Sequence, residues 1–371
     1  MPVMPRRLAG SVALLLVGAA IPAAAQTAPS PSAPQISGTI RGNYQYLFES
    51  GQRRDFNQFT LERVYVTLRG AVVPKLDYRV TTDVYQTAPA DNNGWTVRLK
   101  YAYLDYTFGA SLPWETMVRA GILQTVTIEQ QEAFWPRWLG PVPIDRHGFF
   151  QSADAGIAVR TALPNRLGEV YTHVVNGSGY TRREVDKFKD FAGRISLTPF
   201  SARENPLLAS LTLSGWGYAG TLASRFSDDP FRPVGAGRTR DRWGLHAAVK
   251  DPNLTLAAEH SRRIDDIESG GNTDVDPLLV SSRAGAVTAG YAIVRPLAWF
   301  NATGTSRLGL VGRYDHVEPD REIDGDYHYL LGGLIYDFNR RFGASLNFQE
   351  QLGSSAPGPF RGAFLNFFLD F

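Results

Sequence analysis

The chain has 371 residues, of which 43% are hydrophobic, 12% aromatic and 20% charged, with 36 glycines and no cysteine. Its 38 basic and 36 acidic residues nearly balance, so whole-chain charge does not indicate a nucleic-acid-binding protein. Without cysteine there is neither a disulfide framework nor a lipid-modified cysteine. No apolar run after residue 25 reaches the roughly 20 residues of a spanning helix, which excludes a helical inner-membrane protein.

The first residues have the pattern of a secretory signal peptide. Arg6-Arg7 is followed by an apolar run and then by Ala23-Ala24-Ala25, a small-residue cleavage site. The apolar run has about 14 residues, too few for a transmembrane anchor. We therefore expect three parts: a removed signal peptide at 1–25, a flexible leader at 26–35 and a single barrel domain at 36–371.

The remainder is typical of an all-β protein with many turns. We predict sixteen strands, at residues 36–48, 58–73, 77–86, 97–108, 116–126, 154–162, 169–176, 191–199, 208–219, 241–250, 254–264, 284–295, 305–316, 327–338, 341–351 and 361–371. Tight connections alternate with long ones, as at 73–76 and 86–96. This alternation indicates a transmembrane antiparallel up-and-down β-barrel with short periplasmic turns and long external loops. Roughly 22 residues per strand and connection suit a porin-sized barrel with an aqueous lumen.

Strand parity is compatible with a barrel but does not require one. In the second strand Val66 and Leu68 share an apolar face, while Arg63, Tyr65 and Arg69 share a polar one. A soluble β-protein would turn the polar face to water, and a barrel would turn it to the lumen. The signal peptide, the loop asymmetry and the chain's last strand favour the barrel.

The last strand has one continuously apolar face. This face consists of Ala363, Leu365, Phe367, Leu369 and Phe371. Lipid can cover it if the backbone is fully paired in a closed barrel. The segment resembles the C-terminal signature of bacterial outer-membrane β-barrels, and this resemblance implies that Phe371 is part of the signal read by the outer-membrane assembly machinery.

The third long connection, residues 127–153, is unusually apolar for a loop. Its large side chains are Phe134, Trp135, Trp138, Leu139, Val142, Ile144, Phe149 and Phe150. We expect this third external loop to fold into the barrel, narrow the channel and present Arg137, Arg146 and His147 to solutes. Packing on the rim or against a neighbouring subunit is the alternative.

Five short motifs, in order, resemble the phosphate-selective porin O and P family. They lie at 61–70, 77–83, 99–106, 118–124 and 174–179. The resemblance implies a sixteen-stranded homotrimeric passive channel in the outer membrane of a Gram-negative-type bacterium, surrounded by membrane lipids. It also implies that wall and loop arginines attract anions and that a constriction binds phosphate. The third loop departs from the family because it is rich in Trp and Pro and has only two arginines.

The candidate solute-lining residues are the basic side chains of the polar strand faces and of the third loop. They are Arg63, Arg69, Arg79, Arg98, Lys100, Arg119, Arg137, Arg146, His147 and Arg160, with Arg194 as a further candidate. A basic ring in a low-dielectric constriction favours anions. Nearby carboxylates could instead neutralise these cations as structural ion pairs, namely Asp77, Asp83, Asp105, Glu129, Glu132 and Asp145.

No enzyme, cofactor or metal site is expected. The histidines at 173, 246, 260, 316 and 328 are scattered, without a nucleophile elbow or metal-ligand spacing. Asp265-Asp266 and Asp274-Val-Asp276 could bind Ca²⁺ but lack EF-hand spacing. The expected function is passive diffusion of small hydrophilic solutes, with anions or phosphate as the favoured class. The alternative is a structural or adhesive outer-membrane barrel with little conductance.

Overall fold

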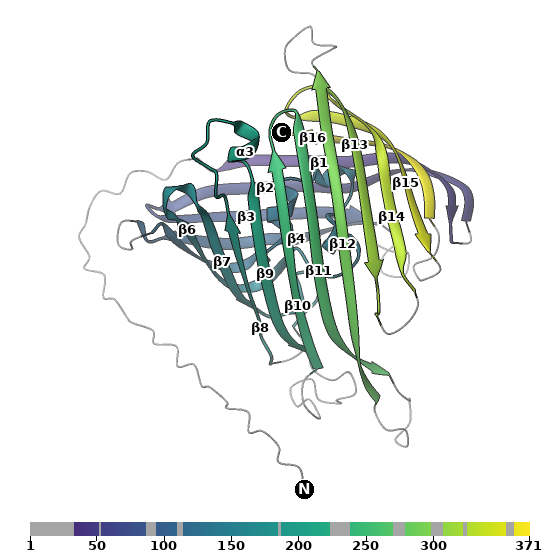
Figure 1. The fold of residues 1–371 in the computed structure, drawn as a ribbon. Helices are drawn as coiled ribbons and strands as arrows, with labels where there is room; N and C mark the ends of the chain where they lie inside the picture. Colours follow the sequence, from purple (N-terminus) through teal and green to yellow (C-terminus); the bar gives the residue numbers. More distant parts are fainter. Residues whose placement is uncertain are drawn as a thin grey trace, which may run out of the picture. The chain divides into compact units, whose positions relative to one another are not determined.

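A computed structural model describes residues 33–51, 53–86, 94–109, 114–184, 187–222, 238–269, 279–297, 307–321, 325–353 and 360–371. In these residues sixteen strands form one antiparallel sheet that closes on itself, because β1 pairs with both β2 and β16 (Figure 1). The predicted fold class is therefore confirmed. The predicted signal peptide, most of the predicted leader, and Asp274 and Asp276 lie outside the described residues.

The strands follow the predicted order. They are β1 (Gln35–Ser50), β2 (Arg53–Val73), β3 (Leu76–Gln86), β4 (Trp95–Thr107), β5 (Thr116–Gln124), β6 (Ala153–Leu163), β7 (Gly168–Val175), β8 (Asp190–Leu197), β9 (Thr212–Leu222), β10 (Arg238–Lys250), β11 (Leu254–Ser269), β12 (Leu279–Leu297), β13 (Arg307–Glu318), β14 (Tyr327–Asp337), β15 (Phe342–Gly353) and β16 (Phe360–Asp370). Helical turns are α1 (Ile128–Glu132), η2 (Arg137–Leu139), α2 (Pro143–Arg146), η3 (Pro164–Arg166) and α3 (Pro206–Ala209). Among the described residues, no helix has the length and apolar character needed to cross a bilayer.

Several strand ends differ from the prediction. The strand expected from residue 208 begins at Thr212, because α3 precedes it and is capped by Asn205, whose Oδ1 accepts a hydrogen bond from the Leu208 amide at 3.0 Å. The β11–β12 pair continues to Ser269 and Leu279, where a long loop was expected. Polar sequences at an exposed rim can pair without burying a charge, so hydropathy does not mark where such strands end.

The predicted contrast between the two rims holds only in part. On the rim where β1 begins and β16 ends, the β2–β3 connection is a two-residue turn, but the β8–β9 connection covers residues 198–211. On the opposite rim the β5–β6 connection covers residues 125–152, but β1 and β2 are joined by only two residues. Loop length alone therefore does not distinguish the two sides of this barrel.

The two faces of the sheet have opposite chemistry. Leu346 and Leu365 are half-exposed on the outside, and an apolar exterior suits lipid. On the inside, the Thr67 and Thr81 hydroxyl oxygens are 2.9 Å apart and Asp83 is fully buried among lumen side chains. The polar strand faces therefore line the lumen of a barrel and do not face outside water as they would in a soluble β-protein.

Two of the register shifts in the sheet are bulges that break the alternation of side chains next to the lumen cations. The β1–β2 register shift leaves Glu62 without a partner residue, and the β3–β4 shift does the same for Lys100. A bulge turns two consecutive side chains toward one face. Glu62 consequently joins Arg63 in the lumen, and Lys100 is buried there beside Tyr101.

The chain's last residue takes part in barrel closure. The Phe371 amide donates to the Gly38 carbonyl at 3.0 Å, and the Gly38 amide donates to the Phe371 carbonyl at 2.9 Å. The Phe371 ring lies directly over Gly38, where a larger residue would collide with it. The role of Phe371 as an assembly signal stays a prediction.

Candidate pore constriction

The connection between β5 and β6, residues 125–152, is called the inward segment below. Its aromatic side chains pack on strands from several parts of the ring: Trp135 lies 4.9 Å from Tyr291 of β12, and Phe150 lies 5.0 Å from Trp216 of β9 (ring centroids). Trp138 contacts β16 as well. A segment that touches walls so far apart around a closed sheet lies inside it. Most of its large apolar side chains, including Trp135 and Ile144, are buried, while Phe134 is only partly buried.

Polar side chains of the wall hold the backbone of the inward segment. Arg313 Nη1 donates to the Pro141 carbonyl at 2.6 Å, and Arg242 Nη1 donates to the Phe149 carbonyl at 2.6 Å. Asn366 of β16 donates to the Trp138 carbonyl at 3.2 Å. These donors satisfy carbonyls that would otherwise be buried without partners. The inward segment is thus fixed mainly to the wall formed by β9–β16.

His147 belongs to this set of anchors. Its Nε2 lies 2.8 Å from Asp315 Oδ2 and its Nδ1 lies 2.9 Å from Tyr327 Oη. The side chain is 2% exposed, and burial lowers its pKa, an effect that Asp315 partly offsets. Arg146 stacks on Tyr329 with its guanidinium carbon 3.7 Å from the ring centroid. In this structure both residues therefore hold the segment, whereas the sequence assigned them to the solute path.

Arginines gather on the other side of the lumen. One cavity of about 550 Å³, here called the Arg63 cavity, is lined by Arg41, Thr60, Leu61, Glu62, Arg63, Tyr85, Gln86, Arg98, Arg137 and Pro141. Arg98 and Arg63 share one carboxylate, that of Asp83, at 2.8 and 3.4 Å. One aspartate cannot neutralise two guanidinium groups. Arg137 pairs with Glu132 at 3.0 Å and with Asp145 at 3.2 Å. Among the four arginines of this cavity, only Arg41 makes no salt bridge with a described residue.

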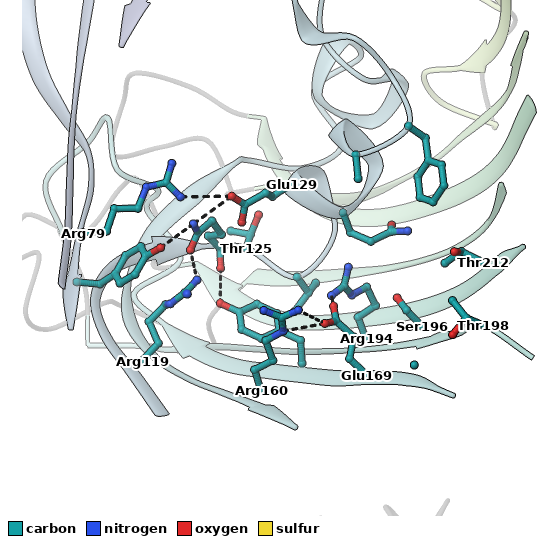
Figure 2. A pocket seen from close by; sticks show the side chains of 18 residues that line it. Arg79, Arg119, Thr125, Glu129, Arg160, Glu169, Arg194, Ser196, Thr198 and Thr212 are labelled. Atoms are coloured by element: carbon teal, nitrogen blue, oxygen red, sulfur yellow. Dashed lines mark hydrogen bonds and ion pairs between the residues drawn. The ribbon is translucent and has the colours of Figure 1, made fainter. Parts of the chain in front are cut away.

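A second cavity of about 600 Å³, the Arg119 cavity, contains four more arginines (Figure 2). Its polar lining includes Arg79, Arg119, Gln124, Glu129, Arg160, Glu169 and Arg194. Arg79 pairs with Glu129 at 3.4 Å, and Arg160 and Arg194 share Glu169. Arg119 pairs with Asp105 at 2.7 Å. Every arginine of this cavity is thus paired, whereas Arg41 of the Arg63 cavity makes no salt bridge with a described residue, and such pairing is what the sequence interpretation allowed.

Several basic residues of the lumen make no salt bridge within the described part of the chain, and four of them were candidates or lie beside candidates. These four are Arg41, Arg69, Lys100 and Arg146. Arg41 and Lys100 both lie against the ring of Tyr65, with the guanidinium carbon and Nζ 5.5 and 5.4 Å from its centroid. Lys100 Nζ also donates to Ser152 Oγ of the inward segment at 2.9 Å. Arg41 and Lys100 thus form a basic site where the segment meets the wall.

The sequence located most of this lining but not all of it. Arg63, Arg98 and Arg137 line the first cavity, and Arg79, Arg119 and Arg160 line the second. Arg69 lines a third cavity of about 330 Å³ together with Arg79. Arg41 and Glu62 were not predicted, and Tyr65 was placed on the polar face without a role. The period-two pattern of β1 could have indicated Arg41, whereas Glu62 faces inward only because of its bulge.

No family model and no curated protein matches the sequence. Solved structures of bacterial outer-membrane channels do match the fold. An anion-selective porin from Comamonas acidovorans is 12% identical with a TM-score of 0.62, covering 92% of this chain and 100% of that chain. The outer membrane channel DcaP of Acinetobacter baumannii is 14% identical with a TM-score of 0.58, covering 91% and 97%. OprB of Pseudomonas putida is 10% identical with a TM-score of 0.56, covering 91% and 94%. The chain thus has the fold of bacterial outer-membrane porins.

Proposed function

We propose that the protein is an outer-membrane porin through which small hydrophilic solutes diffuse passively, with a preference for anions. The observation that carries the proposal is the charge of the lumen. Three of the four arginines that line the Arg63 cavity are paired with carboxylates, but Arg41 and the nearby Lys100 make no salt bridge with any residue that the structure describes. The similarity to an anion-selective porin is consistent with the proposal but extends only to the fold.

The physical basis is electrostatic. A narrow passage with low-dielectric walls strengthens the field of the charges that line it, so a basic lining concentrates anions and repels cations. Guanidinium groups also donate charge-assisted hydrogen bonds to oxyanions. Carboxylates reduce the potential where they pair with the lumen arginines, but Arg41 and Lys100 keep their charge without a salt bridge to a described residue.

The test is a recording from purified, folded protein in a planar lipid bilayer with a KCl gradient. We expect discrete conductance steps and a reversal potential that shows chloride to be the more permeant ion. A cation-selective reversal potential would remove the anion preference and leave the channel. Folded protein that conducts no current would remove the channel itself and favour the structural or adhesive barrel.

Phosphate preference and trimer formation are finer parts of the proposal, and both rest on the resemblance in the strand motifs. If the basic site binds phosphate, phosphate added at a small fraction of the chloride concentration should block the chloride current. Sulfate at the same concentration is the control for charge alone. Chemical cross-linking of the protein in detergent, read by electrophoresis, should give a trimer band if the protein is a homotrimer.

A further inference from the structure

A row of histidines crosses the outer face of the barrel. Neighbouring strands pair His260 with Thr288, Thr288 with His316, and His316 with His328. Residues paired in register point to the same face. That face is the outer one, because Asp315, next to His316, is fully buried in the lumen. Ionisable side chains on this face of a membrane barrel are costly, which makes the row a candidate functional site.

We propose that His316 of this row, together with Glu318 and Asp326, binds a divalent transition-metal ion of the Zn²⁺ class. His316 and Glu318 are two residues apart on β13 and therefore share a face. Asp326 immediately precedes β14, next to the pair Val317 and Tyr327. One ligand atom from each of the three residues lies within 4.8 Å of the others, and His316 Nε2 is 3.3 Å from Asp326 Oδ2.

The donor set determines the class of ion. An imidazole nitrogen with two carboxylates suits Zn²⁺ and related ions, which accept nitrogen and oxygen ligands in small coordination shells. Ca²⁺ and Mg²⁺ prefer six or more oxygen ligands. One of the three ligands in this group is an imidazole nitrogen, which makes these two ions a poorer fit. Two carboxylates also supply the negative charge that a divalent ion needs.

Two neighbours affect the site in opposite ways. The His328 ring stacks on His316 with centroids 5.0 Å apart, and its Nδ1 lies 2.9 Å from Tyr314 Oη. It brings a second imidazole beside the three ligand residues. Arg321 competes with a metal, because its Nε lies 2.7 Å from Glu318 Oε2. That pair lies at the rim, where β13 ends at Glu318, and is partly exposed, so water weakens it and a divalent ion can displace the arginine.

A bound ion would join the two ends of the β13–β14 connection. Glu318 ends β13 and Asp326 precedes β14, so coordination of both residues fixes the connection between the strands. The site lies on the outer face, away from the basic lumen residues. Metal binding should therefore leave the reversal potential of the channel unchanged, and the inference stands independently of the proposed function.

The experiment is a calorimetric titration of the untagged, folded protein in detergent with ZnCl₂. We expect one binding event per chain, lost in His316→Ala and weakened at least tenfold in Asp326→Asn. His260→Ala is the matched control, because His260 belongs to the same row but pairs with Thr288 and should leave binding unchanged. Folding of each variant is checked by its heat-modifiable electrophoretic mobility.

A second measurement separates coordination from weak surface binding. Co²⁺ added to the native protein should give visible absorption bands of a nitrogen- and oxygen-ligated ion, and His316→Gln should lose them. The inference is overturned if the native protein binds no Zn²⁺, or if folded His316→Ala binds it as well as the native protein. Calcium binding of equal strength that does not depend on His316 would also overturn it.

Discussion

At the scale of single residues, Arg41 is the cation whose removal best tests anion preference. It lines the Arg63 cavity, contacts Tyr65 and makes no salt bridge with a residue that the structure describes. We expect Arg41→Gln to lower the anion-to-cation permeability ratio about two- to fivefold, because a unit charge a few ångströms away is worth about 1 kcal/mol in a water-like medium. The reversal potential measures the ratio.

Arg340→Gln is the control for this substitution. Arg340 is exposed in the turn between β14 and β15, outside both cavities, so its removal should not change the ratio. An unchanged ratio in Arg41→Gln would show that Arg41 is not part of the solute path.

His147 should make the anchoring of the inward segment sensitive to pH. Its side chain faces Asp315 and Tyr327, with Arg146 and Arg313 nearby, and burial lowers its pKa. A released segment would bind the proton more readily than the anchored one, so anchoring is strongest above the ordinary histidine pKa of about 6.5 and weakens as the pH falls below it. Conductance fluctuations should therefore increase between about pH 7 and about pH 5.

The variant His147→Gln isolates this effect. Glutamine can donate a hydrogen bond to Asp315 but does not titrate. The conductance fluctuations of the variant should therefore not increase with acid in the way that those of the native protein do. If the variant and the native protein respond equally to acid, another group is responsible.

At the scale of elements, the inward segment depends on Trp135. Its ring is fully buried against Tyr291, and its Nε1 donates to the Gly140 carbonyl at 2.9 Å. Trp135→Ala should remove packing worth about 3–5 kcal/mol. We expect a wider and noisier channel with weaker ion preference, measured as single-channel conductance and reversal potential.

Trp114→Ala provides the matched comparison, because Trp114 is half-exposed just before β5 and belongs to no such packing. It should conduct like the native protein. A folded Trp135→Ala barrel with native conductance would mean that the other anchors suffice to hold the segment.

Elements were easier to predict from the sequence than their contacts. Period-two patterns located sixteen strands, because inward and outward side chains meet different solvents. The apolar residues 134–150 indicated a buried segment for the same reason. The inward position of Glu62 could not be predicted, since a bulge depends on how two strands pair. The pairing of Asp83 with both Arg63 and Arg98 could not be predicted either, because the two arginines come from different strands.

At the scale of the whole molecule, closure of the barrel depends on its last residue. Phe371 bonds to Gly38 through its backbone and leaves its ring exposed on the outer face. We expect Phe371→Ala to reduce severalfold the amount of folded protein in the outer membrane, while refolding in detergent is retained because the backbone bonds remain. Heat-modifiable mobility of membrane fractions measures the folded amount.

The control for assembly is Phe348→Ala, another outward aromatic residue on the neighbouring strand β15. It should assemble normally if the end of the chain is what the assembly machinery reads. An equal loss of folded protein from the outer membrane in both variants would instead indicate a general need for aromatic residues on the outer face.

The inward segment is attached mainly to β9–β16, whereas the Arg63 cavity is formed largely by β1–β4. One half of the barrel thus holds the inward segment, and the other half supplies most of the basic side chains that face the solute. Substitutions in β1–β4 can therefore change the solute preference while most anchors of the inward segment stay in place. Related proteins that carry different solutes should differ first in these strands. For an engineer, those early strands are the place to install a new preference.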